Sequence, residues 1–510
     1  MLALAVRNTK KLVRRFVKEK NIRLGNRFTK EKNAALMAEM ANVPMSETVS
    51  VLDAGAGTGI LGAAIVERIC KEGKGTVKFI DLLCYENCPD YLEMLADNLE
   101  RVRKKCKHDY NIRLRTKIVI SDFLLDEKCQ TPDMKRKRDV FGGYDIAILN
   151  PPTETAEKSS PYGMRVPQMV STSINEAYIF TALALGALKE NGQLIAYLPV
   201  ELATGASLSK AREYLFSHSA IERIHIFRDK PKKTDKADGE DGANRLRPEF
   251  ILKLRKTDIH PQNTVTSVSV GSEAQDVDIL PPVPYDFILR KSDGLITLVK
   301  DIEDVKTFIF LASMPNTLSS IGLKARTGLT LESRYPEFIY DTPSDDRIPL
   351  IVPANIRAGH VDFSENPRYI KPVIPSLIQK NRNMLLIKRI PAKGDGRHLV
   401  CSVYLSSQQY EYNSISTHNK LNYIDYADGK REMDAYMLHG LYALFSSTLY
   451  EKYCSLVFGT SSVNVASFAY IPLPDEGVIR QIGSSLSVSR TFSSRACDNL
   501  VNSALGIRAN

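Results

Sequence analysis

The chain has 510 residues, of which 43% are hydrophobic, and a formal net charge of +10 at pH 7. This length predicts two or more domains with ample core. Its apolar runs are too short for a signal peptide or a membrane span, so we expect a soluble, cytoplasmic protein. The eight cysteines lack the paired spacing of a zinc site or a secreted disulfide framework, so we expect reduced thiols and no metal. The positive charge favours a polyanionic partner.

The first basic stretch, Arg7 to Arg27, has apolar residues at helical spacing. We expect a helix with a solvated charged face rather than a phosphate-binding arm. Gly25 to Thr29 follows, and Thr29 is expected to cap the next helix, which is rich in Ala and Met and ends at Met40. A strand is then predicted from Thr48 to Leu52.

Small residues follow this strand directly: Asp53 begins a run in which Gly55, Gly57 and Gly59 alternate with other residues. Glycines let the backbone approach a ligand closely, and the helix after them presents free N–H groups. The order strand, glycines, helix is the context that a nucleotide-binding loop requires.

The next two predicted strands also end in polar side chains. Val77 to Tyr85 ends at Glu86, whose carboxylate suits the two hydroxyls of a ribose. Lys117 to Ile120 is followed by Asp122, a carboxylate for an adenine amino group, and Phe123, a ring for its face. We therefore predict the nucleoside-binding half of an α/β sheet.

A fourth predicted strand, Ala147 to Leu149, breaks into Asn150-Pro151-Pro152-Thr153. Prolines end a central strand, so this loop lies at the carboxyl edge, where open α/β sheets bind ligands. An amide oxygen and unpaired carbonyls are fixed acceptors that suit an amino group acting as a nucleophile; an ordinary turn is the alternative. Together with the glycine spacing, the loop favours S-adenosylmethionine over a dinucleotide.

These motifs, in this order, resemble the N6-adenine DNA methyltransferases of bacterial restriction-modification systems, of the Eco57I-like type with a C-terminal target-recognition domain. Gly25 with Phe28-Thr29 resembles the family's Gly-x-x-Phe-Thr-Pro element, with Lys30 in place of proline. The segments that resemble the rest of the family pattern are Ser160 to Tyr162, Asn175 to Leu188, Gly192 to Pro199, Lys388-Arg389, His418 to Ile424, and Gly459 to Pro474.

The resemblance implies an α/β, Rossmann-like methyltransferase domain at 1–258, a linker at 259–284 and a mixed α+β target-recognition domain at 285–510. It implies catalytic roles for Asn150, Pro151, Pro152 and Thr153. The implied cofactor-binding residues are Phe28, Thr29, Asp53, Gly55, Gly57, Gly59, Glu86, Asp122 and Phe123. The candidates for DNA contact are Arg357, Lys388, Arg389, Asn419, Asn422 and Asn464, each of which also has a structural explanation as a surface charge or turn residue.

The implied reaction takes place on an adenine flipped out of double-stranded DNA. Asn150 and the Pro151 carbonyl would accept the two N6 hydrogens while the methyl group arrives from S-adenosylmethionine, without a metal. A companion restriction endonuclease acting on the same site is the further partner that the resemblance implies.

Two departures from the family pattern leave alternatives open. Thr153 stands where the family usually has an aromatic residue, whose stacking on the base is worth about 1 to 3 kcal/mol. The loop from Arg228 to Arg247 lacks the aromatic that covers the other face of the base, and Phe227, Phe250 or Tyr162 is a candidate substitute. A catalytically degenerate DNA-binding relative is therefore the main alternative. Methylation of RNA, of a protein amino group or of cytosine N4 also remains open.

Two further expectations concern the fold. Phe250 to Leu254 is predicted as the last strand of the catalytic sheet, because a polar segment with prolines near its end follows it. Met433 to Tyr453 is predicted as one amphipathic helix whose aromatic residues belong to the core.

Overall fold

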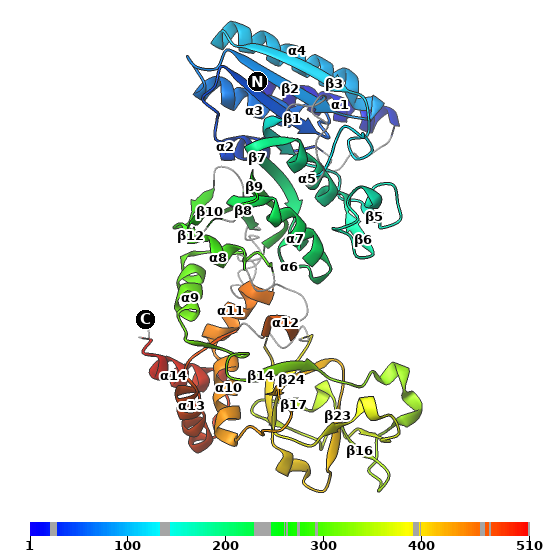
Figure 1. The fold of residues 1–510 in the computed structure, drawn as a ribbon, viewed down its shortest axis with the longest axis vertical. Helices are drawn as coiled ribbons and strands as arrows, with labels where there is room; N and C mark the ends of the chain where they lie inside the picture. Colours follow the sequence, from blue (N-terminus) through cyan, green and yellow to red (C-terminus); the bar gives the residue numbers. More distant parts are fainter. Residues whose placement is uncertain are drawn as a thin grey trace. The chain divides into compact units, whose positions relative to one another are not determined.

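The structure is a computed structural model that describes residues 1–20, 28–132, 143–228, 246–259, 261, 264–272, 276–290, 294–390, 397, 399–458, 465–468 and 471–507. The chain divides into two compact units, Met1–Asp301 and Ile302–Asn510, which are treated separately below (Figure 1). Gly25, Asn464 and the loop at 229–245 lie outside the described residues.

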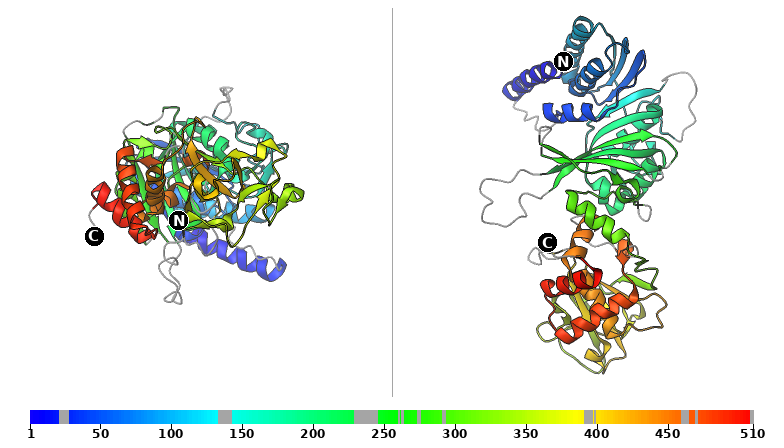
Figure 2. Two further views of the ribbon diagram at one scale, coloured as in Figure 1. Left: turned by 90° about the horizontal axis from the view of Figure 1, so that it is seen from below. Right: turned by 90° about the vertical axis from the view of Figure 1, so that its left-hand side faces the viewer.

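A ten-stranded sheet forms the centre of the first unit, with the order β11-β10-β8-β9-β7-β4-β1-β2-β3 and β12 paired to β10. β1, β2, β3, β4 and β7 run parallel, while β9 runs antiparallel between β7 and β8 (Figure 2). The bounds are β1 Thr48–Ala54, β2 Phe79–Tyr85, β3 Arg113–Val119, β4 Tyr144–Leu149, β7 Leu188–Pro199, β8 Ser219–Arg228, β9 Leu246–Lys256, β10 Val265–Gly271, β11 Val277–Ile279 and β12 Val283–Pro284.

The chain adds β2 and β3 on one side of β1 and then returns to its other side with β4. The carboxyl ends of β1 and β4 therefore meet at the point where the strand order reverses, which is where open α/β sheets bind ligands. This arrangement confirms the predicted α/β, Rossmann-like class of the first unit.

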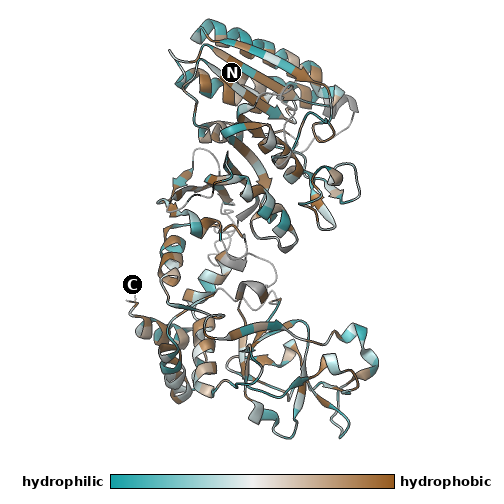
Figure 3. Cartoon of the chain, in the orientation of Figure 1, coloured by the Kyte–Doolittle hydropathy of each residue, from teal (hydrophilic) through white to brown (hydrophobic). Residues whose placement is uncertain are grey.

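Helices pack against this sheet because alternate strand side chains are apolar. Val51, Ile80 and Ile148 belong to one buried cluster with apolar residues of the first four helices, while α4 exposes charged residues to solvent (Figure 3). α1 exposes basic residues such as Arg7 and Lys10, in agreement with the predicted solvated face. The helices of the first unit are α1 Leu2–Lys20, α2 Glu31–Met40, α3 Ile60–Glu72, α4 Pro89–Tyr110, α5 Glu176–Ala187, α6 Glu201–Thr204, α7 Ser209–Ser217 and α8 Tyr285–Ile288.

The structure differs from the predicted linker at 259–284. β10 pairs in parallel with β8, so β9 is an internal strand and not the last one. The sequence of this segment is polar, but its polar residues Thr266 and Ser269 are fully buried and have hydrogen-bond partners within the sheet. The Thr266 hydroxyl donates to the Ile221 carbonyl, and Ser269 Oγ lies 3.0 Å from His225 Nδ1. The boundary between the units accordingly falls at Asp301.

The second unit is mixed α+β, as predicted. Its sheets are β14-β24-β21-β22, β15-β19-β16-β23-β20, β17-β18 and β13-β25. The strands are β13 Asn316–Thr317, β14 Leu323–Thr327, β15 Ile339–Tyr340, β16 Ile348–Ile351, β17 Ile356–Arg357, β18 His360–Val361, β19 Tyr369–Ile370, β20 Gln379–Lys380, β21 Met384–Lys388, β22 Cys401–Tyr404, β23 Ser414–Thr417, β24 Leu421–Tyr426 and β25 Pro472–Leu473. The helices are α9 Ile302–Ala312, α10 Ala435–Ser446, α11 Thr448–Phe458, α12 Val465–Phe468, α13 Glu476–Ser489 and α14 Ser494–Leu505.

The helix predicted from Met433 to Tyr453 is in fact two helices, α10 and α11, separated by Ser447 in extended backbone. The predicted core role of its aromatic residues is confirmed for Tyr442, Phe445, Tyr450 and Tyr453 but not for Tyr436, which is 53% exposed. No helix within the described ranges is long and apolar enough to cross a membrane.

Candidate active site

The loop between β1 and α3 depends on its glycines. Gly55, Gly57 and Gly59 have φ angles of 76°, 57° and 81°, in the left-handed region that favours glycine. A Cβ at Gly59 would lie 2.8 Å from Leu95 Cδ1 of α4. The predicted glycine loop therefore forms, and its path allows α4 to pack closely against it.

Helix α1 supports this loop from behind, a feature that the sequence interpretation missed. Asn98 Nδ2 donates to the Thr58 carbonyl at 2.9 Å, and Asn8 Nδ2 donates to Asn98 Oδ1 at 2.9 Å. The hydroxyls of Thr9 and Thr58 lie 2.7 Å apart. The available signal was the pair Asn8-Thr9 on the apolar face of an amphipathic helix, because buried polar side chains need partners.

Asp53 lies at the carboxyl end of β1 and is completely buried. Its Oδ2 accepts the backbone N–H of Gly62 at 2.8 Å, whereas Oδ1 is buried and has no hydrogen-bond partner among the described residues. Burial, with a smaller contribution from the nearby Glu86 carboxylate, raises the pKa of Asp53 to about 7 against the opposing effect of the Gly62 N–H. An unsatisfied buried acceptor is rare enough in native proteins to indicate a missing donor.

Glu86, at the end of β2, is held by two backbone amides. Its Oε2 accepts the N–H of Gly57 at 2.6 Å and its Oε1 accepts the N–H of Cys88 at 2.8 Å. Each carboxylate oxygen can accept a second hydrogen bond, so the group can still receive ligand hydroxyls. The bond to Gly57 ties the end of β2 to the glycine loop.

Asp122 and Phe123 follow β3 and lie against different partners. Asp122 Oδ2 accepts the Tyr162 hydroxyl at 2.6 Å, and this bond is the main cause that raises the pKa of Tyr162 to about 12. The Phe123 ring stacks on Phe180 with centroids 5.3 Å apart and meets the edge of Tyr85 at 5.0 Å. Phe123 therefore belongs to a buried aromatic cluster, with Asp122 beside it.

Asn150 ends β4 and points towards Thr29. Its Nδ2 donates to Thr29 Oγ1 at 3.0 Å, although the two residues come from distant parts of the chain. The prediction that Thr29 caps α2 is wrong, because the N-cap residue is Lys30 and no side chain caps that helix. Within the described residues neither Asn150 Oδ1 nor the Pro151 carbonyl accepts a hydrogen bond. Two neighbouring acceptors are thus left available.

The rest of the loop at 150–153 is anchored by Asn175, which the sequence interpretation did not single out. Asn175 Nδ2 donates to the Thr153 carbonyl at 2.9 Å, while its Oδ1 accepts the Ala177 N–H at 2.9 Å as the N-cap of α5. Thr153 and Asn175 are connected along the chain by a short hairpin, β5 Thr155–Glu157 paired with β6 Ser173–Asn175. The side chains of Pro152 and Thr153 remain exposed.

Two of the three candidate aromatic substitutes are excluded by burial. Phe227 and Phe250 are both 0% exposed. The Phe227 ring packs 4.6 Å from the His225 ring and 5.6 Å from the Tyr197 ring. Both phenylalanines are core residues and cannot reach a ligand without disrupting the sheet. Tyr162, which is half-buried, is the candidate that remains.

One hollow joins these elements. It is lined by Phe28, Thr29, Gly55, Ala56, Gly57, Thr58, Ile60, Leu61 and Asn150. The Phe28 ring lies 3.7 Å from the place where a Cβ of Gly57 would stand. The hollow measures about 30 Å³, the size of one water. Among the described residues no group of His, Cys, Asp and Glu side chains is arranged to hold a metal.

The predicted DNA contacts in the second unit fall into two groups. Arg357 is engaged within its own hairpin, where its guanidinium bonds the Ala354 carbonyl at 2.7 Å and Glu365 at 2.5 Å. Lys388 and Arg389 are half-exposed at the end of β21. The Arg389 N–H donates to the Lys420 carbonyl at 2.8 Å, which brings this end of the strand beside the turn that follows β23.

The two described asparagines of that region, Asn419 and Asn422, are buried or half-buried within the unit. Asn422 is 0% exposed, and its Oδ1 accepts the Thr327 hydroxyl at 3.4 Å, so the structure contradicts a surface contact there. Asn419 is half-buried; its backbone N–H donates to the Thr330 carbonyl at 2.8 Å, and its Oδ1 is buried with no partner among the residues that the structure describes. Asn464 lies outside the described residues.

No family model matches the chain. Its sequence is 26% identical over 499 residues to the Type II methyltransferase M.PstI of Providencia stuartii, which covers 95% of this chain and 93% of that relative. It is 23% identical over 479 residues to the Type II methyltransferase M.BsuBI of Bacillus subtilis, covering 90% and 89%. A solved nuclease-deletion mutant of the Type ISP restriction-modification enzyme LlaGI, in complex with a DNA substrate mimic, aligns with a TM-score of 0.41 at 13% identity, covering 94% of this chain and 56% of that one. The chain is thus similar, across both of its units, to two Type II methyltransferases.

Proposed function

We propose that the protein is a DNA methyltransferase of a restriction-modification system, and that it methylates N6 of adenine with S-adenosylmethionine. One observation carries the proposal: Asn150, whose Oδ1 is an available acceptor, lines the same hollow as the glycine loop, and the available Pro151 carbonyl follows it in the chain. The names of the two sequence relatives support the methyltransferase activity and its connection with restriction-modification.

The residues around the hollow fit S-adenosylmethionine. Asp53 Oδ1 is an unsatisfied buried acceptor, and Gly55 and Gly57 leave space that a Cβ would fill. Glu86 would hold the ribose hydroxyls and Asp122 the adenine amino group. Bound there, S-adenosylmethionine supplies an electrophilic methyl group on a positively charged sulfur, and the three carboxylates complement that charge.

Asn150 and Pro151 would act on the target amine. Their two oxygens accept its two hydrogens, which draws the nitrogen away from planarity and frees its lone pair for attack. Thr29 fixes the orientation of the amide, because its hydroxyl binds Nδ2 and leaves Oδ1 as the free acceptor. The acceleration then comes mainly from positioning, after the base has been flipped at a cost of a few kcal/mol.

The capture of the base differs from the usual arrangement. Thr153 is exposed and carries no ring, and Phe227 and Phe250 are buried. Tyr162 is the aromatic side chain that can leave its bond to Asp122 and cover the base. We therefore propose weaker capture of the flipped adenine than an aromatic at position 153 would give.

The second unit is proposed to read the DNA sequence. Lys388 and Arg389 are its best-placed candidates for phosphate contact, because both are half-exposed beside the same turn. A companion restriction endonuclease that cuts the same sequence belongs to this proposal.

The test uses purified protein, tritiated S-adenosylmethionine and unmethylated duplex DNA of mixed sequence, followed by nucleoside analysis. Asn150→Ala is compared with Asn413→Ala, a control at an exposed position. We expect N6-methyladenine with the natural protein and the control, and none with Asn150→Ala. N4-methylcytosine would contradict the adenine assignment. Binding of cofactor and DNA without transfer would favour the degenerate relative, and absence of cofactor binding would refute the methyltransferase.

A further inference from the structure

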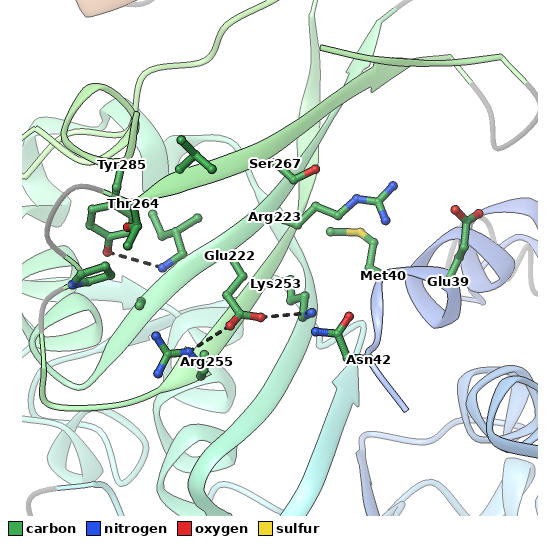
Figure 4. A pocket seen from close by; sticks show the side chains of 14 residues that line it. Glu39, Met40, Asn42, Glu222, Arg223, Lys253, Arg255, Thr264, Ser267 and Tyr285 are labelled. Atoms are coloured by element: carbon green, nitrogen blue, oxygen red, sulfur yellow. Dashed lines mark hydrogen bonds and ion pairs between the residues drawn. The ribbon is translucent and has the colours of Figure 1, made fainter. Parts of the chain in front are cut away.

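A second and larger cavity lies at the opposite edge of the same sheet. β4 and β8 point in the same direction, since β4 is parallel to β7, and β9 is antiparallel to both β7 and β8. Asn150 follows the carboxyl end of β4, whereas this cavity opens at the amino ends of β8 and β10. It measures about 470 Å³, within the range of sites for small molecules. Figure 4 shows the charged side chains of Glu222 and Arg223 from β8 and of Lys253 and Arg255 from β9, with Ser267 of β10 beside them.

Two cations stand next to each other on the floor of this cavity. Lys253 of β9 is the direct cross-strand partner of Arg223 of β8, which in turn is the direct partner of Ser267 of β10. Like charges in directly opposite positions destabilise a sheet. The cost is larger here than at an open surface because the Lys253 side chain is only 4% exposed.

The carboxylates of the cavity do not neutralise both Arg223 and Lys253. Glu222 is shared, with one oxygen 3.0 Å from Lys253 Nζ and the other 2.9 Å from Arg255 Nε. Glu39 also lines the cavity but is exposed. In the part of the chain that the structure describes, Arg223 has no ion-pair partner, and its Nε is buried without a hydrogen-bond acceptor (Figure 4).

The field of Arg223 acts on its neighbours. Burial lowers the pKa of Lys253, and Arg223 lowers it further although Glu222 opposes both. Burial likewise lowers the pKa of His225 to about 4, with Arg223 as the second cause. The cavity thus disfavours further positive charge, which is the electrostatic condition for binding an anion.

We propose that this cavity is a binding site for a phosphoryl group, held by Arg223, Lys253 and Ser267. The Arg223 guanidinium offers a planar fork that matches two phosphate oxygens, and Nε is the donor that lacks a partner. Lys253 has donors beyond the one that meets Glu222, and Ser267 adds a hydroxyl from the next strand. An incoming dianion offsets the repulsion between the adjacent cations. The proposal does not depend on methyl transfer.

The test is calorimetric titration of the full chain with inorganic phosphate in a low-chloride buffer. Arg223→Gln is the test variant and Arg101→Gln the control, because Arg101 is an exposed helix residue of the same unit paired with Asp97. We expect saturable binding to the natural protein and the control, and at least about tenfold weaker binding to Arg223→Gln, the loss of one charge-assisted contact. Equal affinity in all three proteins, or no saturable binding to the natural protein, would overturn the proposal.

Two further measurements make the outcome specific. Ribose 5-phosphate and ribose are titrated in parallel: tighter binding of the former than of inorganic phosphate assigns a phosphorylated metabolite, equal binding assigns the free anion, and binding of ribose alone overturns the site. The second measurement is thermal unfolding without phosphate. Since Arg223→Gln removes a like charge beside Lys253, we expect its Tm to equal or exceed that of the natural protein, so weaker binding cannot come from misfolding.

Discussion

At the carboxyl edge of the sheet in the first unit, Asp53 and Glu86 place negative charge around the glycine loop; at the amino edge, Arg223 and Lys253 place positive charge around a wider cavity. Most of these groups are bonded to their neighbours, yet in the described part of the chain each edge has a buried atom without a partner, Asp53 Oδ1 at one and Arg223 Nε at the other. An acceptor is missing its donor at one edge and a donor its acceptor at the other. The two proposals accordingly assign opposite ligands to the two edges, a cationic methyl donor and an anion.

The largest effect is expected at the carboxyl edge from Asn150→Ala. Removal of the amide oxygen takes away one of the two acceptors for the target amine, so kcat should fall by about 10³-fold or more. The affinity for S-adenosylmethionine should stay within about twofold, because the amide acts on the acceptor base. Single-turnover transfer and equilibrium dialysis measure the two quantities. A matching loss of cofactor affinity would show that Asn150 serves the cofactor instead.

Thr29→Val should lower kcat by about 10-fold, because the Asn150 amide loses the bond that selects its orientation. Thr29→Ser keeps the hydroxyl and should restore the rate to within about twofold. Turnover of the three proteins at saturating cofactor and DNA checks this prediction. Failure of the serine variant to restore the rate would assign Thr29 a packing role.

The charge at the carboxyl edge predicts a pH dependence that the amino edge should not share. Because the pKa of Asp53 is raised to about 7, its carboxyl is largely protonated at pH 6 and ionised at pH 8. The cationic donor prefers the ionised form, so its affinity should rise about tenfold from pH 6 to pH 8. Calorimetry at these pH values with Asp53→Asn, whose affinity should be weak and independent of pH, provides the check.

The same shift has the opposite sign for the stability of the free protein. The folded state binds the Asp53 proton more tightly than the unfolded state, in which the pKa of this carboxyl stays near its ordinary value of 3.8. This contribution is fully present below about pH 4 and is lost as the pH rises towards 7. Asp97→Asn, an exposed control in the same unit, should not change how the free energy of unfolding depends on pH.

The smallest effect is expected from Tyr162→Phe. The variant loses the bond to Asp122 and frees that carboxylate, so affinity for S-adenosylmethionine should rise by about two- to fivefold. Phosphate binding at the amino edge should not change, just as Arg223→Gln should not alter cofactor affinity. If Tyr162→Phe altered phosphate affinity, or Arg223→Gln altered cofactor affinity, the two sites would not be independent.

The sequence predicted that the residues after β1, β2 and β4 lie at one edge of the sheet, because parallel strands bring their carboxyl ends together whatever the loops do. Asp53, Glu86 and Asn150 were recognisable as polar residues after apolar runs. The bond between Thr29 and Asn150 was not, since it depends on how distant segments approach in space. The pair of adjacent cations, Arg223 and Lys253, was missed for the same reason, because these residues become neighbours only through the pairing of β8 with β9.

The errors outside the site have a common physical cause. Thr266, Ser269 and Asn422 are polar, and their polarity suggested a linker or a surface contact. Each is buried and hydrogen-bonded inside a sheet. A sequence pattern records polarity but not whether a partner stands opposite, so small polar strand residues are its characteristic failure.

The anchor that Asn175 provides has a consequence for how the loop at 150–153 can change. Asn175 donates a hydrogen bond to the main-chain carbonyl of Thr153, whose side chain faces solvent. The hydrogen bond that anchors the loop therefore does not depend on the side chain at position 153. Loop geometry and grip on the base are separate properties here, and an aromatic ring can be gained or lost at this position while the backbone that holds Asn150 and Pro151 stays as it is.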